Sequence, residues 1–110
     1  MTDELTPFEP ASPEVIAWVD DRCDRIARAK GERGAQAAYI HAMKALPRHG
    51  APRIPTWQQY EMVLLALEHA AWAAGVPESV ATRWHGDTRA RVAREIKEGA
   101  ARWRQRQDAQ

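Results

Sequence analysis

The stretch TWQQYEMVLLALEHAAWAAG, residues 56–75, predicts the central helix of this protein. Thr56 with Gln59 three residues later is a capping-box pattern, which is typical of a helix start. Gly75 marks the end, because glycine readily adopts the left-handed conformation that closes a helix. We expect one unbroken helix from about residue 57 to residue 74. Its main apolar face has helical spacing and comprises Tyr60, Val63, Leu64, Leu67, Ala71 and Ala74.

A second apolar strip lies on the same helix, away from the main face. Leu65 and Trp72 are roughly 120–140° from Tyr60 when each residue turns the helix by about 100°. They lie beside Glu61 and Glu68. A helix that is apolar on two sides is either central in its bundle or part of an interface. Because tryptophan is enriched in binding hot spots, we interpret Leu65 and Trp72 as a candidate interface, with core packing as the alternative.

Two further helices precede this one. The first spans residues 12–31, with Ser12 as its N-cap, Pro13 at its first position and Gly31 at its end. The second runs from about residue 33 to residue 46 and ends at Pro47. The segment PRHGAPRIPT, residues 47–56, has too many prolines for a helix and predicts a stiff connector. The buried faces are Val15, Val19, Cys23 and Ile26 in the first helix, and Ala35, Ala38, Tyr39, Ala42, Met43 and Leu46 in the second.

After Gly75 the sequence predicts a short helix over residues 77–84. The residues HGD, 85–87, then break the chain, and Asp87 caps a last helix. That last helix carries Val92, Ile96, Ala100 and Trp103 at helical spacing. The prediction is therefore an all-α fold, a compact bundle of four main helices plus one short helix. It forms a single domain over residues 1–110, with flexible ends at 1–11 and 107–110.

The composition excludes several classes of protein. With 45% hydrophobic and 28% charged residues, the chain has the composition of a folded, soluble domain and not of a disordered one. No run of eighteen apolar residues predicts a membrane span. Cys23 is the single cysteine, so an internal disulfide is impossible. The N-terminus is acidic and lacks the apolar run of a signal peptide, and we expect a cytoplasmic protein.

The charge is distributed unevenly along the chain. Residues 1–24 hold seven acids and one arginine, a net charge of −6, whereas residues 82–110 hold eight bases and four acids, a net charge of +4. In the last helix, Glu95 and Glu98 form i,i+4 ladders with several arginines, and Arg89, Arg104 and Arg106 lie outside those ladders. The basic end fits contact with nucleic acid, with an acidic partner, or with the acidic end of the same protein.

The segment AAWAAGVPESVATRW, residues 70–84, resembles a helix-turn-helix motif, with Ala71 as its small residue and Gly75 as its turn glycine. The positions that such a motif buries are all apolar here: Ala70, Ala71, Ala74, Val76, Ala81 and Trp84. The resemblance implies that the second helix enters the major groove of DNA. Ser79, Thr82 and Arg83 would then contact DNA, with Arg89 and Arg104 adding positive charge. A single small motif buries little DNA surface, which favours a homodimer.

The alternative to this motif is an ordinary helical hairpin inside a bundle. It is favoured by Val80, which falls at a position that the motif exposes, and by Glu78, whose charge phosphates repel. The function would then be a helical protein-interaction module, such as an adaptor, an inhibitor or a phage-type assembly subunit. The acidic first helix, Leu65 with Trp72, or the basic last helix would be its contact surface.

Residue types that carry enzyme chemistry form no recognisable set. His41, His49, His69 and His85 lack the spacing of a helical zinc site. Cys23 lies in an apolar face, where packing is its expected role. No nucleophile motif or phosphate-binding loop is present. We therefore predict a non-enzymatic protein without metal, cofactor or small-molecule substrate.

Overall fold

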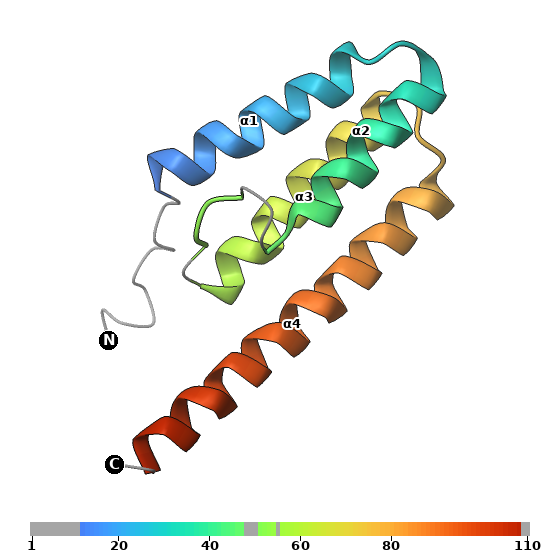
Figure 1. The fold of residues 1–110 in the computed structure, drawn as a ribbon. Helices are drawn as coiled ribbons and strands as arrows, with labels where there is room; N and C mark the ends of the chain where they lie inside the picture. Colours follow the sequence, from blue (N-terminus) through green and yellow to red (C-terminus); the bar gives the residue numbers. More distant parts are fainter. Residues whose placement is uncertain (1–11, 48–50, 55, 109–110) are drawn as a thin grey trace, which may run out of the picture.

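Four α-helices make up most of the described chain, and no β-strand occurs in it (Figure 1). The structure is a computed structural model that describes residues 12–47, 51–54 and 56–108. The helices are α1 (Pro13–Arg28), α2 (Gly31–Ala45), α3 (Trp57–Ala73) and α4 (Glu78–Asp108). Helix α3 packs against the other three, whereas α1 and α4 do not pack against each other within the described residues. The predicted all-α bundle with a central third helix is confirmed.

Two of the predicted helix starts, at Ser12 and Thr56, are confirmed by side-chain caps. The Ser12 hydroxyl accepts a hydrogen bond from the Val15 amide at 3.3 Å, and the Thr56 hydroxyl accepts one from the Gln59 amide at 3.1 Å. Each cap satisfies a backbone donor that lacks a partner inside its helix. The predicted end of the first helix is displaced: α1 ends at Arg28. Gly31, with φ of +71°, instead begins α2.

The core is built on one face of α3. Apolar side chains from all four helices surround this face, and Leu64 and Leu67 at its centre are fully buried. Ala74 lies at the edge and is only partly buried. Gly75 follows with φ of +92°, so the turn into α4 uses a conformation that other residues rarely adopt. The prediction of an unbroken third helix with Leu67 and Ala71 buried is confirmed.

The predicted break at residues 85–87 is wrong, because α4 is one helix of 31 residues. A glycine inside a helix costs only about 1 kcal/mol, and tertiary packing on both sides of Gly86 outweighs that cost. Ala81 before it and Thr88 and Val92 after it are fully buried. Asp87 is not a cap, and its carboxylate lies 3.8 Å from the Arg83 guanidinium one turn earlier. The short helix and the last helix of the prediction are therefore a single element.

Two polar contacts fasten α2 to α4. The Tyr39 hydroxyl donates a buried hydrogen bond of 2.7 Å to the Ala81 carbonyl. The Arg91 guanidinium donates to the carbonyls of Met43, at 2.8 Å, and of Leu46 at the end of α2. Positive charge at a helix C-terminus satisfies its last carbonyls and complements the helix dipole. Arg91, which the sequence places in a charge ladder, thus also caps α2.

The predicted flexible ends fall partly within the described chain. Helix α4 continues as regular helix through Gln107 and Asp108. Residues 1–11 and 109–110 lie outside the described residues, as do 48–50 and 55 of the predicted connector. Among the described helices, none combines the length and the apolar character needed to cross a membrane.

Candidate functional site

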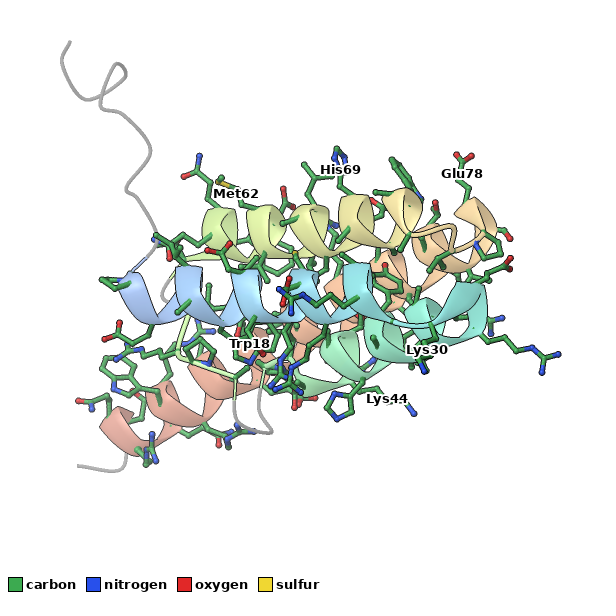
Figure 2. All side chains as sticks on the ribbon, turned by 90° about the horizontal axis from the view of Figure 1, so that it is seen from above. Trp18, Lys30, Lys44, Met62, His69 and Glu78 are labelled. Atoms are coloured by element: carbon green, nitrogen blue, oxygen red, sulfur yellow. The ribbon has the colours of Figure 1, made fainter. Side chains whose placement is uncertain are left out.

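The outer face of α3 presents an apolar strip to solvent. We call Met62, Leu65, His69 and Trp72 the α3 strip; their spacing of three, four and three residues places them on one side of the helix. The exposed fractions of Met62, Leu65 and Trp72 are 53%, 47% and 42%. Figure 2 shows Met62 and His69 projecting from the same side of α3. The prediction that Leu65 and Trp72 lie off the buried face is confirmed, and Met62 and His69 complete the strip.

Two aromatic rings stack at the C-terminal end of the α3 strip. The His69 and Trp72 rings lie 5.3 Å apart between centroids, with an angle of 22° between their planes. Stacking of flat rings fixes the two side chains relative to each other, so less conformational entropy is lost when a partner covers them. The two stacked rings therefore present one flat aromatic surface.

A groove of about 530 Å³ runs beside the strip, between α3 and α4. Two polar pairs between α3 and α4 involve residues that line it. Arg89 holds the Glu61 carboxylate, with the shorter hydrogen bond at 2.7 Å, and His85 Nδ1 lies 2.9 Å from a Glu68 carboxylate oxygen. The groove is lined by Gln58, Glu61, Met62, Leu65, His85 and Arg89.

Arg89 pairs with an acidic residue of α3. The prediction that it has no acidic partner is therefore wrong. Its guanidinium donates two hydrogen bonds to Glu61, at 2.7 and 3.0 Å, and lies over the Trp57 ring at 5.1 Å. The hydrogen bond from Arg89 and its positive charge lower the pKa of Glu61. The spacing of charges within one helix could not reveal this partner, because Glu61 is 28 residues away in the chain.

Glu68 is buried, although the sequence places it beside the exposed strip. Only 6% of the residue is exposed, and its carboxylate pairs with His85. A buried carboxylate needs a hydrogen-bond partner, because an isolated one is strongly disfavoured outside water. The contacts Glu68–His85 and Glu61–Arg89 join α3 to α4. The two helices run in opposite directions (Figure 1).

The burial pattern around Gly75 fits both interpretations of residues 70–84. Of the positions that a helix-turn-helix motif buries, Ala71, Val76 and Ala81 are buried and the remainder are partly buried. Val80 packs against the core. The extended antiparallel contact between α3 and α4 is the arrangement of a helical hairpin, and it favours the hairpin interpretation.

The residues predicted to contact DNA are spread along α4. Ser79, Thr82 and Arg83 are exposed on its first two turns, and Arg104 is exposed near its end. At about 1.5 Å per residue, Ser79 and Arg104 are separated by roughly 37 Å along the helix axis. Arg83 forms a loose ion pair with Asp87 at 3.8 Å, both side chains being largely exposed. These residues therefore do not form one compact patch.

The end of α4 extends beyond the bundle, as Figure 1 shows. We call residues 96–108 the α4 arm; all of them are exposed except Gly99, which is partly buried. The exposed fractions of Ile96 and Trp103 are 47% and 55%. The apolar stripe predicted for the last helix is therefore buried at Val92 but open to solvent further along.

Cys23 and the histidines form no reactive set in the described chain. Burial is the main cause that raises the pKa of the Cys23 thiol, which faces the Ala66 carbonyl at 3.7 Å. The thiol is thus held in its unreactive protonated form. Among the described residues, no group of three or more histidine, cysteine or acidic side chains is placed to hold a metal ion.

Comparison with known proteins adds no assignment to these surfaces: no protein-family model, no curated protein and no solved structure matches the chain.

Proposed function

We propose that this protein is a non-enzymatic helical interaction module that self-associates through the α3 strip. The observation that carries the proposal is the exposure of Met62, Leu65 and Trp72 on one side of the central helix, at the spacing that helix pairs use. Large apolar side chains that gather on one exposed face mark contact sites more often than single exposed residues do. The spacing of these exposed side chains suits contact with a second helix, which supports a function in protein interaction.

The occupant that fits the α3 strip best is the α3 strip of a second copy. In an antiparallel pair related by a two-fold axis, Met62 of one copy lies opposite Trp72 of the other, and Leu65 lies opposite His69. A flexible thioether against an indole ring is a favourable contact. The flanking Ala66 and Ala73 are small, so the two helices can approach closely.

The charges beside the strip do not oppose this pairing. Acids on a shared face would repel their copies across a two-fold axis. Here Glu61 is held by Arg89, and Glu68 is buried against His85. The antiparallel pairing also places Glu61 opposite the neutral Ala73 of the partner. Neither of these two acids therefore adds an unpaired charge beside the apolar side chains of the strip.

The length of the α3 strip limits the expected strength of dimerisation. Helix α3 has 17 residues, so its axis is roughly 25 Å long. One helix pair covers less than the standard interface of about 1,600 Å², so we expect a dimer with a dissociation constant in the micromolar range. Such a dimer dissociates within the concentration range that sedimentation can sample.

The test is sedimentation equilibrium over a range of protein concentrations, with Leu65→Glu and Thr82→Glu as matched variants. Leu65→Glu places a charge in the centre of the strip, and we expect it to keep the protein monomeric without lowering its thermal stability. Thr82→Glu adds the same charge to an exposed site on α4, and we expect it to dimerise like the wild type. A wild type that stays monomeric throughout would contradict the proposal.

DNA binding is the second candidate function, supported by the exposure of Ser79, Thr82 and Arg83 on consecutive turns of α4. Hydroxyl and guanidinium groups on one exposed helix face suit contacts to phosphates or base edges. A dimer built on α3 would present two such faces, which suits a two-fold site on DNA.

Fluorescence anisotropy with a mixed-sequence duplex at two salt concentrations tests this second candidate. If Arg83 contacts a base, Arg83→Ala weakens specific binding by about 1–3 kcal/mol; if it contacts a phosphate, the salt slope falls by about one unit. Absence of binding by the wild type at low salt eliminates DNA binding. The proposal of self-association is unaffected by that outcome.

A further inference from the structure

A second apolar strip begins on α4 just before the α4 arm and continues along it. Ala93, Ile96, Ala100 and Trp103 follow the same spacing of three, four and three residues, and we call them the α4 strip. Ile96 and Trp103 are about half exposed, at 47% and 55%. A helix that presents a continuous apolar strip with no covering element is typical of helix-to-helix recognition.

The base of this strip opens into a groove of about 450 Å³ between α4 and the start of α3. Its apolar wall comes from Ile54, Trp57 and Tyr60, and Ile96 forms the edge next to the arm. Arg53 adds a positive charge at its rim. A groove of this kind accepts one large apolar side chain, which would anchor a partner that lies along the arm.

Basic side chains flank the α4 strip. In the heptad that the strip defines, Lys97 and Arg104 occupy one flanking row and Arg106 lies in the other, and all three are exposed. Glu98 projects to the opposite side of the helix, at 100° per residue. The surface next to the apolar strip is therefore positively charged, although the arm as a whole contains acids too.

We propose that the α4 arm and the groove at its base bind an acidic amphipathic helix of a partner protein. Apolar residues of that helix would pack on Ile96 and Trp103, and acidic residues at its flanking positions would pair with Lys97 and Arg104. A second copy of the arm is disfavoured as the occupant, because an antiparallel pair would bring basic rows together. This inference uses a surface distinct from the α3 strip and does not depend on self-association.

The same arm is a poorer match for nucleic acid. Phosphates pair with the basic residues but leave Ile96, Trp103 and the apolar groove uncovered. Glu95 and Glu98 also reduce the net positive charge of the helix. An occupant that covers both the apolar strip and its basic flanks satisfies the whole surface, and an acidic amphipathic helix does so.

The test uses two designed helical peptides of about three heptads with identical leucine seams. One carries glutamate at its flanking positions and the other carries lysine. Fluorescence anisotropy at low salt measures the binding of each labelled peptide to the full-length protein, with a mixed-sequence DNA duplex as a third probe. We expect the glutamate peptide to bind at least tenfold more tightly than the lysine peptide, a difference of about 1.4 kcal/mol.

Charge reversal gives the sharpest version of this test. The triple variant Lys97→Glu, Arg104→Glu, Arg106→Glu should invert the preference, so that the lysine peptide binds more tightly. Arg102→Glu is the matched control, because it makes the same change on the side of the arm away from the strip, and it should keep the original preference. Trp103→Ala should weaken the glutamate peptide at least tenfold.

All of these sites are exposed, so circular dichroism should show folded variants. Equal binding of the two peptides, no binding of either, or an unchanged preference in the triple variant would overturn the proposal. Tight binding of the duplex that is lost in the triple variant, together with no binding of the glutamate peptide, would assign the arm to nucleic acid instead.

Discussion

The two faces of α3 are both apolar, yet only one of them is covered. On the inner face Leu64, Leu67 and Ala71 are fully buried. On the outer face Leu65 and Trp72 keep nearly half of their surface exposed, at 47% and 42%. The inner face meets α1, α2 and α4, whereas no described element covers the α3 strip. One helix thus stabilises the fold with one side and offers a binding surface with the other.

This difference separates stability from function along a single helix. Removing apolar atoms from the inner face leaves a cavity that the surrounding side chains fill only in part. Removing them from the outer face exposes little that was not already in water. Substitutions on α3 should therefore fall into two classes, one that unfolds the protein and one that only changes its association.

The largest effect is expected from a charge on the inner face. Ala71→Glu places a carboxylate where α3 meets its neighbours, with no space or partner for it, and it should destabilise the fold by several kcal/mol. Ala73→Glu, two residues further along on the exposed side, should cost less than about 1 kcal/mol at protein concentrations where the dimer has dissociated. Urea unfolding of both variants measures the contrast. Equal stability of the two would show that Ala71 is not at a close helix contact.

Neighbouring leucines give the same contrast with smaller changes. Leu64→Ala should lower the free energy of unfolding by about 2–5 kcal/mol, because Leu64 is fully buried. Leu65→Ala should lower it by less than about 1 kcal/mol when measured at protein concentrations where the dimer has dissociated. Similar losses in both variants would mean that the outer face is also part of the core.

Glu61 lies on the border between the two faces of α3. Through this residue the free energy of unfolding should depend slightly on pH. Its folded-state pKa is lowered, chiefly by the hydrogen bond from Arg89, so the pair stabilises the fold above the ordinary glutamate pKa. That contribution is lost as the pH falls through the lowered pKa. An NMR titration of the carboxyl group should show this pKa, and Arg89→Ala should move it upward. An unchanged Glu61 pKa in that variant would contradict the pairing.

The local signals in the sequence were enough for most helix boundaries. Thr56, Ser12 and Gly75 act within a few residues of themselves, and the structure confirms each of them as a cap or turn residue. The failure at Gly86 has a physical cause. Glycine followed by aspartate favours a break locally, but buried Thr88 and the His85–Glu68 pair hold the helix from outside.

The sequence predicts the candidate surfaces less completely, because they depend on contacts between residues that are distant in the chain. The angles of Leu65 and Trp72 on α3 predict that they lie off the main face, and the heptad spacing of the same strip also includes Met62 and His69. The pairing of Arg89 with Glu61 depends on how α3 and α4 pack, which no pattern within α4 contains. Exposure of Ile96 and Trp103 follows from where the bundle ends, not from their spacing.

Sedimentation equilibrium of the wild type, Trp72→Ala and Trp103→Ala tests most directly whether the α3 strip is an interface. Both tryptophans are about half exposed, so the two variants remove the same side chain from two different surfaces. We expect the wild type and Trp103→Ala to form dimers at micromolar concentrations, and Trp72→Ala to remain monomeric with nearly unchanged stability. A Trp72→Ala protein that dimerises as well as the wild type, or that loses its stability while its mass is unchanged, would contradict the assignment of this face to self-association.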